Sequence, residues 1–98
     1  MKIVWTPLAI ERVSEIAEYI AQDKPAAALK WINTAFSKVE LLASSPETGR
    51  IVPEIHNDRF RELIFGNYRI IYCLEKKQIS ILTIRHGKQI LPIEDDWA

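Results

Sequence analysis

Arg69 and His86 are the two residues whose types and predicted positions suggest chemistry. A guanidinium can stabilise a phosphate or a developing anion, and an imidazole can exchange a proton near neutral pH. The alternation of side chains on neighbouring strands places both residues on one sheet face, one diagonal step apart. The simpler alternative is that Arg69 forms a solvated ion pair with Glu62 and that His86 merely ends its strand. A register slip of one residue would exchange the two faces.

Other reactive groups are few. Cys73 is the single cysteine, and no base lies in its predicted neighbourhood, so we expect it to fill space rather than to act as a nucleophile. His56 and His86 are too few and too far apart for a zinc site, and we expect neither a metal nor a cofactor. One cysteine cannot form an internal disulfide, which is typical of a protein from the reducing cytoplasm.

Two amphipathic helices must precede the strands that carry these groups. Residues 2–5 are β-branched, aromatic or basic and predict a short strand, and Thr6 is a suitable N-cap for a helix that begins at Pro7. Apolar residues then recur every three or four positions and predict a helix over residues 7–22. A second stripe of this kind spans residues 25–43. The short connection predicts an antiparallel helix hairpin whose apolar face needs a sheet to cover it.

Three β-rich runs follow the helices, over residues 60–65, 68–75 and 78–86. Gly66-Asn67 and Lys76-Lys77 separate them, and links this short make consecutive strands antiparallel. The predicted fold class is therefore α+β, with a helix hairpin packed on an antiparallel sheet in the order β-α-α-β-β-β. We expect a single domain over residues 1–98. The place of the first strand in the sheet is left open.

The strand register follows from the lengths of the two turns. A two-residue turn at Gly66-Asn67 makes Leu63 face Ile70. An even link after the next strand makes Leu74 face Ile79 and Ile70 face Thr83. The face that carries Ile70 collects most of the large apolar side chains, so we expect the helix hairpin to cover it.

The opposite face is half polar in this register. It carries Arg69 and His86, and we expect it to stay open to solvent. Residues 46–58 precede the three strands and contain two prolines and one glycine, which predicts a long surface loop. A loop of that length is usually functional or mobile.

Charge is distributed unevenly along a chain whose net charge is zero. Hydrophobic residues make up 48% and charged residues 27%, which is typical of one small soluble domain without a membrane span or secretion signal. Residues 50–90 carry eight basic and four acidic groups, whereas residues 91–98 carry three acids and no base. The local cationic excess fits either a surface that faces a polyanion or an ordinary solvated sheet.

Five short motifs follow one another along the chain: Pro46-Glu47-Thr48-Gly49-Arg50, Pro53-Glu54, Arg61-Glu62, Tyr68-Arg69-Ile70-Ile71-Tyr72 and Arg85-His86-Gly87. Together with the strand and the helix hairpin before them, they closely resemble the RelE/ParE superfamily of toxins from bacterial type II toxin-antitoxin systems. The resemblance covers nearly the whole chain. It implies a small cytoplasmic toxin that forms a hetero-oligomer with a co-expressed antitoxin and is neutralised by it.

The resemblance also implies two alternative targets. RelE-like members cleave messenger RNA on the ribosome with several cations around the scissile phosphate, whereas ParE-like members poison DNA gyrase without a known chemical step. Arg69 matches the arginine of the RelE-like Tyr-Arg-hydrophobic-hydrophobic-Tyr strand, and His86 is similar to a histidine that some cleaving relatives use. Gln89, however, stands where a second catalytic arginine would follow Gly87-Lys88, and no tyrosine follows it.

These departures favour a ParE-like toxin that inhibits DNA gyrase. Under the alternative of a ribosome-dependent messenger RNA endonuclease, Arg69 would contact the phosphate and His86 would act as acid or base. A third alternative is a degenerate member that binds its antitoxin without being toxic. The candidate contacts to the target are Arg50, Arg61, Glu62, Arg85, Lys88 and Gln89.

Overall fold

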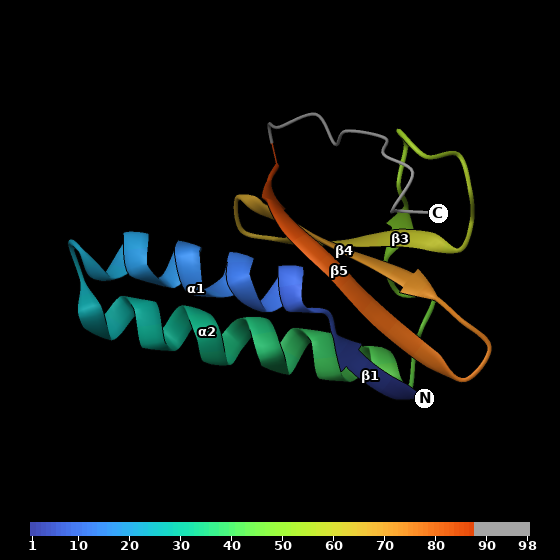
Figure 1. The fold of residues 1–98 in the computed structure, drawn as a ribbon, viewed down its shortest axis with the longest axis horizontal. Helices are drawn as coiled ribbons and strands as arrows, with labels where there is room; N and C mark the ends of the chain where they lie inside the picture. The colour runs from blue at the N-terminus through green and yellow to red at the C-terminus, as the bar shows by residue number, and fades with distance from the viewer. Residues whose placement is uncertain (88–98) are drawn as a thin grey trace.

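The computed structural model describes residues 1–87 of the 98-residue chain and shows two helices packed against a twisted sheet (Figure 1). In chain order the elements are β1 (Lys2–Trp5), α1 (Pro7–Ala21), α2 (Pro25–Glu40), the short 3-10 helix η1 (Leu41–Ala43), β2 (Arg50–Ile51), β3 (Phe60–Phe65), β4 (Tyr68–Leu74) and β5 (Gln78–His86). The predicted α+β class and element order are confirmed. The two-residue strand β2 lies within the segment that was predicted to be a loop.

The sheet has five strands in the order β1-β5-β4-β3-β2. Strands β3 to β5 are antiparallel, as predicted. The additional strand β2 also pairs with β3 in antiparallel fashion, whereas β1 pairs with β5 in parallel. A parallel neighbour requires a long crossover connection, which the helix hairpin and the following strands supply. The sequence left the place of β1 open, and the structure puts it at the edge beside β5.

Both helices begin where the sequence predicts. Thr6 caps α1, because its side-chain oxygen accepts a hydrogen bond of 3.3 Å from the backbone N–H of Ala9. Proline occupies the first turn of each helix, where the missing N–H has no intrahelical partner to lose. None of the helices in residues 1–87 is long and apolar enough to cross a bilayer.

The predicted register is confirmed on one side of β4. Leu63 faces Ile70 across β3 and β4, and Gly66 adopts a φ of 57° in the turn that joins these strands. A positive φ costs glycine little, so this residue suits the two-residue turn. At the other end of β4, Leu74 faces Ile79 as predicted.

A bulge between Ile71 and Tyr72 makes the rest of the predicted register wrong by one residue. Tyr72 faces Ile81, but Ile71 faces Thr83, so Leu82 is an extra residue on β5. Ile70 therefore faces Ile84 rather than Thr83. Beyond the bulge every side chain of β5 points to the opposite face from the one predicted.

The helix face is the sheet face that α1 and α2 cover, and it carries the main core. Its fully buried side chains from the sheet are Ile70, Tyr72, Ile79, Ile81 and Ile84, and the helices add Ala9, Val13 and Val39. The rings of Trp5 and Phe36 pack against each other at a tilt of 48°, with centroids 4.5 Å apart. This part of the prediction is confirmed, except that the bulge moves Ile84 onto this face.

The opposite face, here called the loop face, is not open as the sequence predicted. Val52 and Ile55 from the segment between β2 and β3 pack on Phe60, Ile71 and Cys73 of the sheet. Val52 and Ile71 are completely buried. The segment that was expected to be a surface loop therefore closes the second face of the sheet.

Candidate functional site

Arg69 lies in the middle of the loop face, and only 5% of it is exposed. Its Nε donates a hydrogen bond of 2.7 Å to Glu62 Oε1. Its two terminal nitrogens donate bonds of 2.8 Å each to the two carboxylate oxygens of Glu54. This paired, planar arrangement is the geometry that favours arginine over lysine. The guanidinium is therefore held by two carboxylates.

One continuous charged network of alternating sign joins four side chains, those of Arg50, Glu62, Arg69 and Glu54. Arg50 Nε donates to Glu62 Oε2, and 62% of the Arg50 side chain is exposed, whereas Glu62 is 1% exposed. The hydrogen bonds to Glu54 raise the pKa of the Arg69 guanidinium above its already high ordinary value, against the opposing effect of burial. Arg69 is thus a permanent cation that two carboxylates bind.

The predicted juxtaposition of Arg69 and His86 does not form. The bulge pairs Arg69 with Arg85 and pairs His86 with Tyr68. His86 therefore points to the helix face, where its ring meets the Tyr68 ring edge-on at a centroid distance of 5.8 Å. The two groups lie on opposite faces of the sheet. The ion pair between Arg69 and Glu62, which the sequence offered as the alternative, is present but buried rather than solvated.

Glu54 is the functional partner that sequence reasoning missed. Its carboxylate comes from the segment between β2 and β3 and reaches Arg69 fifteen positions later in the chain. Backbone bonds from Val52 N–H to Phe60 O and from Ile55 N–H to Val52 O, at 3.0 and 3.2 Å, shape this segment. A signal was available, because a buried arginine needs carboxylates and Pro53-Glu54 was one of the motifs. Its position over the sheet could not be read from spacing.

Tyr72 fixes the segment before β2. Its hydroxyl donates a hydrogen bond of 2.9 Å to Pro46 O and accepts one of 2.8 Å from Gly49 N–H. Burial raises the pKa of the Tyr72 phenol. A Cβ at Gly49 would lie 2.5 Å from the Tyr72 hydroxyl and 2.6 Å from Glu62 O, so only glycine fits. The motif Pro46-Glu47-Thr48-Gly49-Arg50 is thus bound to the sheet through its backbone.

Arg61 also holds this segment. It was expected to contact a target, but its Nη1 donates to Gly49 O at 3.1 Å and its Nε donates to Asp58 O at 3.1 Å. Glu62 is similarly occupied within the charged network. Among the candidate contacts within residues 1–87, Arg50 presents its side chain to solvent and Arg85 is half-buried. Lys88 and Gln89 lie outside the described residues.

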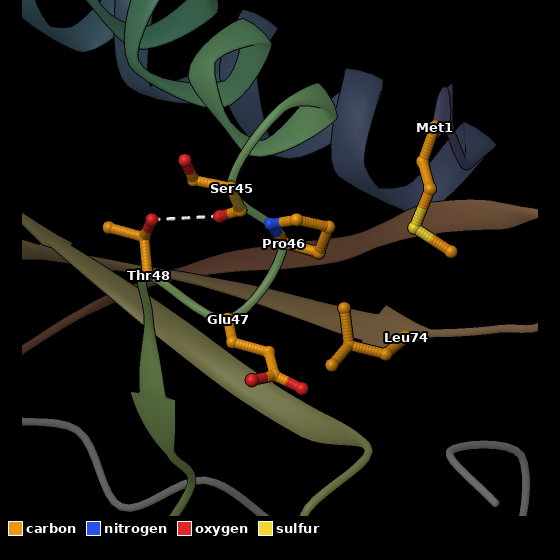
Figure 2. Close-up of a pocket in the computed structure, with 6 residues that line it drawn as sticks. All are labelled: Met1, Ser45, Pro46, Glu47, Thr48 and Leu74. Atoms are coloured by element: carbon orange, nitrogen blue, oxygen red, sulfur yellow. Dashed lines mark hydrogen bonds between the residues drawn. The ribbon is translucent and has the colours of Figure 1, made fainter.

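A hollow of about 640 Å³ lies beside the segment that Tyr72 fixes. In Figure 2 the side chains of Met1 and Leu74 stand on one side of it and Glu47 and Thr48 on the other. The Thr48 hydroxyl donates a hydrogen bond of 2.7 Å to Ser45 O, which fixes the rim. The apolar wall and the single carboxylate suit an apolar or cationic side chain of a partner protein.

Cys73 fills space on the loop face, as expected. It is 5% exposed and packs with Val52, Phe60 and Ile71. Burial raises the pKa of its thiol, so the nucleophilic thiolate is disfavoured at neutral pH. The Arg59 Nη2 contact at 3.9 Å opposes this shift without reversing it. Within residues 1–87, the surroundings of this thiol are therefore not those of a reactive cysteine.

Comparisons with known proteins agree with this geometry. Residues 3–91 match the family described as ParE toxin of type II toxin-antitoxin system, parDE. The candidate toxin Y4kP of Sinorhizobium fredii is 34% identical over 93 residues, which cover 93% of each chain. Toxin RelE2 of Caulobacter vibrioides is 30% identical over 90 residues, which cover 91% of this chain and 98% of the relative.

A solved structure shares the fold. A chain from the chromosomal ParDE toxin-antitoxin system of P. aeruginosa superposes with a TM-score of 0.75 and is 23% identical in sequence. The match covers 90% of this chain and 97% of that one. At this level of identity the likeness establishes the arrangement of helices and strands.

Proposed function

The chain belongs to the ParE toxin family of type II toxin-antitoxin systems, and from that premise we propose that it inhibits DNA gyrase and is neutralised by a cognate antitoxin in the cytoplasm. The proposal has two parts with different support. The antitoxin partner follows from membership of the family. The choice of gyrase over the ribosome rests on the site.

The choice of gyrase as the target rests on one observation, that the Arg69 guanidinium is already bound by two carboxylates. Cleavage of RNA next to a 2′-hydroxyl needs cations that converge on the phosphorane and a group that exchanges a proton there. Arg69 is 5% exposed, and its three donor nitrogens contact Glu54 and Glu62. His86 lies on the other sheet face. The arrangement supports a toxin that acts by binding a protein.

The edge formed by β2 and β3 is the best candidate for the contact with gyrase. Ile51 is 44% exposed and Ile64 is 53% exposed. Arg50 is the member of the charged network that is most exposed to solvent. Exposed apolar residues beside an arginine are typical of protein interfaces. Glu62 would then act as a positioning residue, because it holds Arg50 rather than touching the target.

A supercoiling assay tests the proposal. Purified toxin at stoichiometric excess over gyrase should block supercoiling of relaxed plasmid and accumulate cleaved DNA without ribosomes. Arg50→Glu should weaken this inhibition about tenfold or more, because it reverses a charge at the proposed contact. Lys77→Glu is the matched control, since Lys77 is exposed in the turn between β4 and β5. Normal supercoiling with folded wild-type toxin would refute gyrase as the target.

A translation assay on the same preparation tests the endonuclease alternative, and induction of the toxin in cells tests the degenerate-member alternative. Cuts at codon positions in translating extracts that disappear in Arg69→Lys would indicate the ribosome-dependent endonuclease instead. Lysine keeps the charge but cannot make the paired contacts of arginine, so the variant needs a check of folding by circular dichroism. Induction of the toxin alone without growth arrest would indicate a degenerate member that only binds its antitoxin.

A further inference from the structure

The strand β5 is paired along only part of its length on the side away from β4. It runs from Gln78 to His86, but β1 pairs only with residues 78–81 (Figure 1). Thr6 then closes this pairing, because its N–H and its hydroxyl both donate to Ile81 O, at 3.1 and 2.8 Å, and the hydroxyl also lies 3.1 Å from Leu82 O. Within residues 1–87 no strand continues past this point along β5.

The direction of the backbone groups beyond Thr6 follows from the ladder. Gly87 N–H donates to Asn67 O at 2.6 Å, on the side of β4. In an antiparallel pair the bonding direction alternates, so Arg85 and Thr83 also point their N–H and C=O groups toward β4. Ile84 points its N–H and C=O away from β4. No strand within residues 1–87 pairs with these two groups, so they form an edge that can pair with an extended chain.

A hollow of about 330 Å³ lies against this edge. Its lining comes from residues 12, 15 and 16 of α1, from residues 84–86 of β5 and from Tyr68 of β4. The hollow therefore lies on the helix face, whereas the Arg85 side chain, opposite Arg69, points to the loop face. The Arg12 guanidinium lies 2.8 Å from Glu15 Oε2, so those two charges balance each other. Arg85 is the remaining permanent charge of the lining.

Among residues 1–87, Arg85 has no counter-charge of the kind that its neighbour Arg69 has. It stands directly opposite Arg69 in the sheet, but Glu54 and Glu62 both bind Arg69. The Nε of Arg85 is buried, and no group in the described part of the chain accepts a hydrogen bond from it. The Thr83 hydroxyl, two residues earlier on the same side of β5, is also buried and unpartnered within residues 1–87. A buried donor of this kind is costly unless a ligand supplies the acceptor.

We propose that an extended acidic segment of the antitoxin adds to the uncovered edge of β5 at Ile84 and places a carboxylate against Arg85. This inference rests on the antitoxin partnership in the proposed function, and it names the edge and the chemistry of the contact. Main-chain bonds to Ile84 would give affinity, and the Arg85 guanidinium would select an acidic side chain on the loop-face side of the added strand. A nucleic-acid phosphate could accept from Arg85 but could not donate to the Ile84 carbonyl.

Affinity measurements with the co-expressed cognate antitoxin test the contact directly. Arg85→Glu should raise the Kd on the order of 100-fold, because it places two negative charges against each other. Lys77→Glu changes charge equally at the far end of β5 and should leave the Kd unchanged. Thermal unfolding of each variant shows whether it is folded. An Arg85→Glu toxin that is folded and binds as tightly as the control would overturn the proposal.

A charge-swap series separates a direct pair from a general electrostatic effect. Each acidic residue of the antitoxin is replaced in turn by arginine and tested against the Arg85→Glu toxin. One replacement should restore most of the lost affinity while weakening binding to the wild-type toxin. Failure of every replacement to restore binding would contradict a carboxylate partner for Arg85.

Amide hydrogen exchange tests the pairing at the edge of β5 without any substitution. In the toxin alone the Ile84 amide should exchange faster than the amides of Thr83 and Arg85, which face β4. Binding of antitoxin should slow the Ile84 amide at least tenfold. An Ile84 amide that exchanges at the same rate in the complex would show that no strand is added there.

The acidic residues near the end of this chain are the competing occupant. A toxin with Glu94→Gln, Asp95→Asn and Asp96→Asn should bind antitoxin normally and should still lose affinity when Arg85→Glu is added. If the Arg85→Glu effect disappears in that background, the carboxylate comes from this chain and the proposal fails. None of these measurements involves gyrase, so they stand or fall independently of the supercoiling assay.

Discussion

Both faces of the sheet carry buried side chains, but different forces bury them. Two helices cover the helix face, where apolar side chains of the sheet such as Ile70, Ile79 and Ile81 pack against them. The loop face is covered by a short segment that contributes Val52 and Ile55 and otherwise depends on the charged network. Hydrophobic burial has no preferred direction, whereas hydrogen-bonded ions need particular partners. The helix face should therefore tolerate conservative changes that the loop face does not.

The difference also explains where function can reside. The segment of residues 46–58 is held on the sheet by the ion pair between Arg69 and Glu54, so it can present its exposed residues in one defined position. Glu54 and Tyr72 fix the two parts of this segment, and Arg50 and Ile51 lie between them at the sheet edge. On the helix face, most of the large side chains of the sheet are used in packing instead.

Removal of the central cation should have the largest effect on stability. Arg69→Ala leaves the buried Glu62 without its internal partner and should lower the free energy of unfolding by about 4 kcal/mol. Arg50→Ala is the control from the same network, and because that side chain is 62% exposed its loss should stay within about 1 kcal/mol. Urea denaturation measures both. Equal losses in the two variants would contradict the central place of Arg69.

A cavity on the helix face should have a smaller and graded effect. Ile79 is completely buried, and Ile79→Ala should lower the free energy of unfolding by about 3 kcal/mol, while Ile79→Val should cost about 1 kcal/mol. On the loop face, Arg69→Lys should recover little of the Arg69→Ala loss, because lysine cannot bind two carboxylates in the same plane. A graded response on both faces would remove the distinction between them.

The Tyr72 hydroxyl connects the core of the helix face to the segment before β2. Its removal should have the smallest effect on the free energy of unfolding. Tyr72→Phe leaves Gly49 N–H and Pro46 O without their partner and should cost about 1.5 kcal/mol at neutral pH. Burial raises the pKa of Tyr72 above its ordinary value of 10.0, so the folded state favours the neutral phenol. The stability from this group is present below pH 10 and is lost as the pH rises through the folded pKa.

The measurement for Tyr72 is unfolding at a series of pH values. The wild-type protein should lose stability above pH 10 more steeply than Tyr72→Phe, so the gap between them should narrow. A gap that stays constant up to pH 11 would show that the phenol does not titrate differently in the folded and unfolded states. Circular dichroism of both proteins at neutral pH serves as the control for folding.

Local signals were enough to predict most elements of the fold. Thr6 and Pro7 fixed the start of α1, and the turn at Gly66 fixed the register of β3 against β4, because these depend on residues close together in the chain. The bulge opposite Ile71 could not be predicted, since an extra residue in a strand leaves no mark in the alternation of an apolar run. That single residue moved His86 to the other face.

The sequence alone determined the order of the main elements, the starts of both helices and the family resemblance, because periodicity, caps and ordered motifs are properties of neighbouring residues. Only the tertiary structure decided that a loop segment covers the loop face, that Glu54 binds Arg69 and that Arg85 stands opposite Arg69 without a counter-charge among residues 1–87. These contacts join positions far apart in the chain. Their formation depends on how a short segment crosses the sheet, which no local preference specifies.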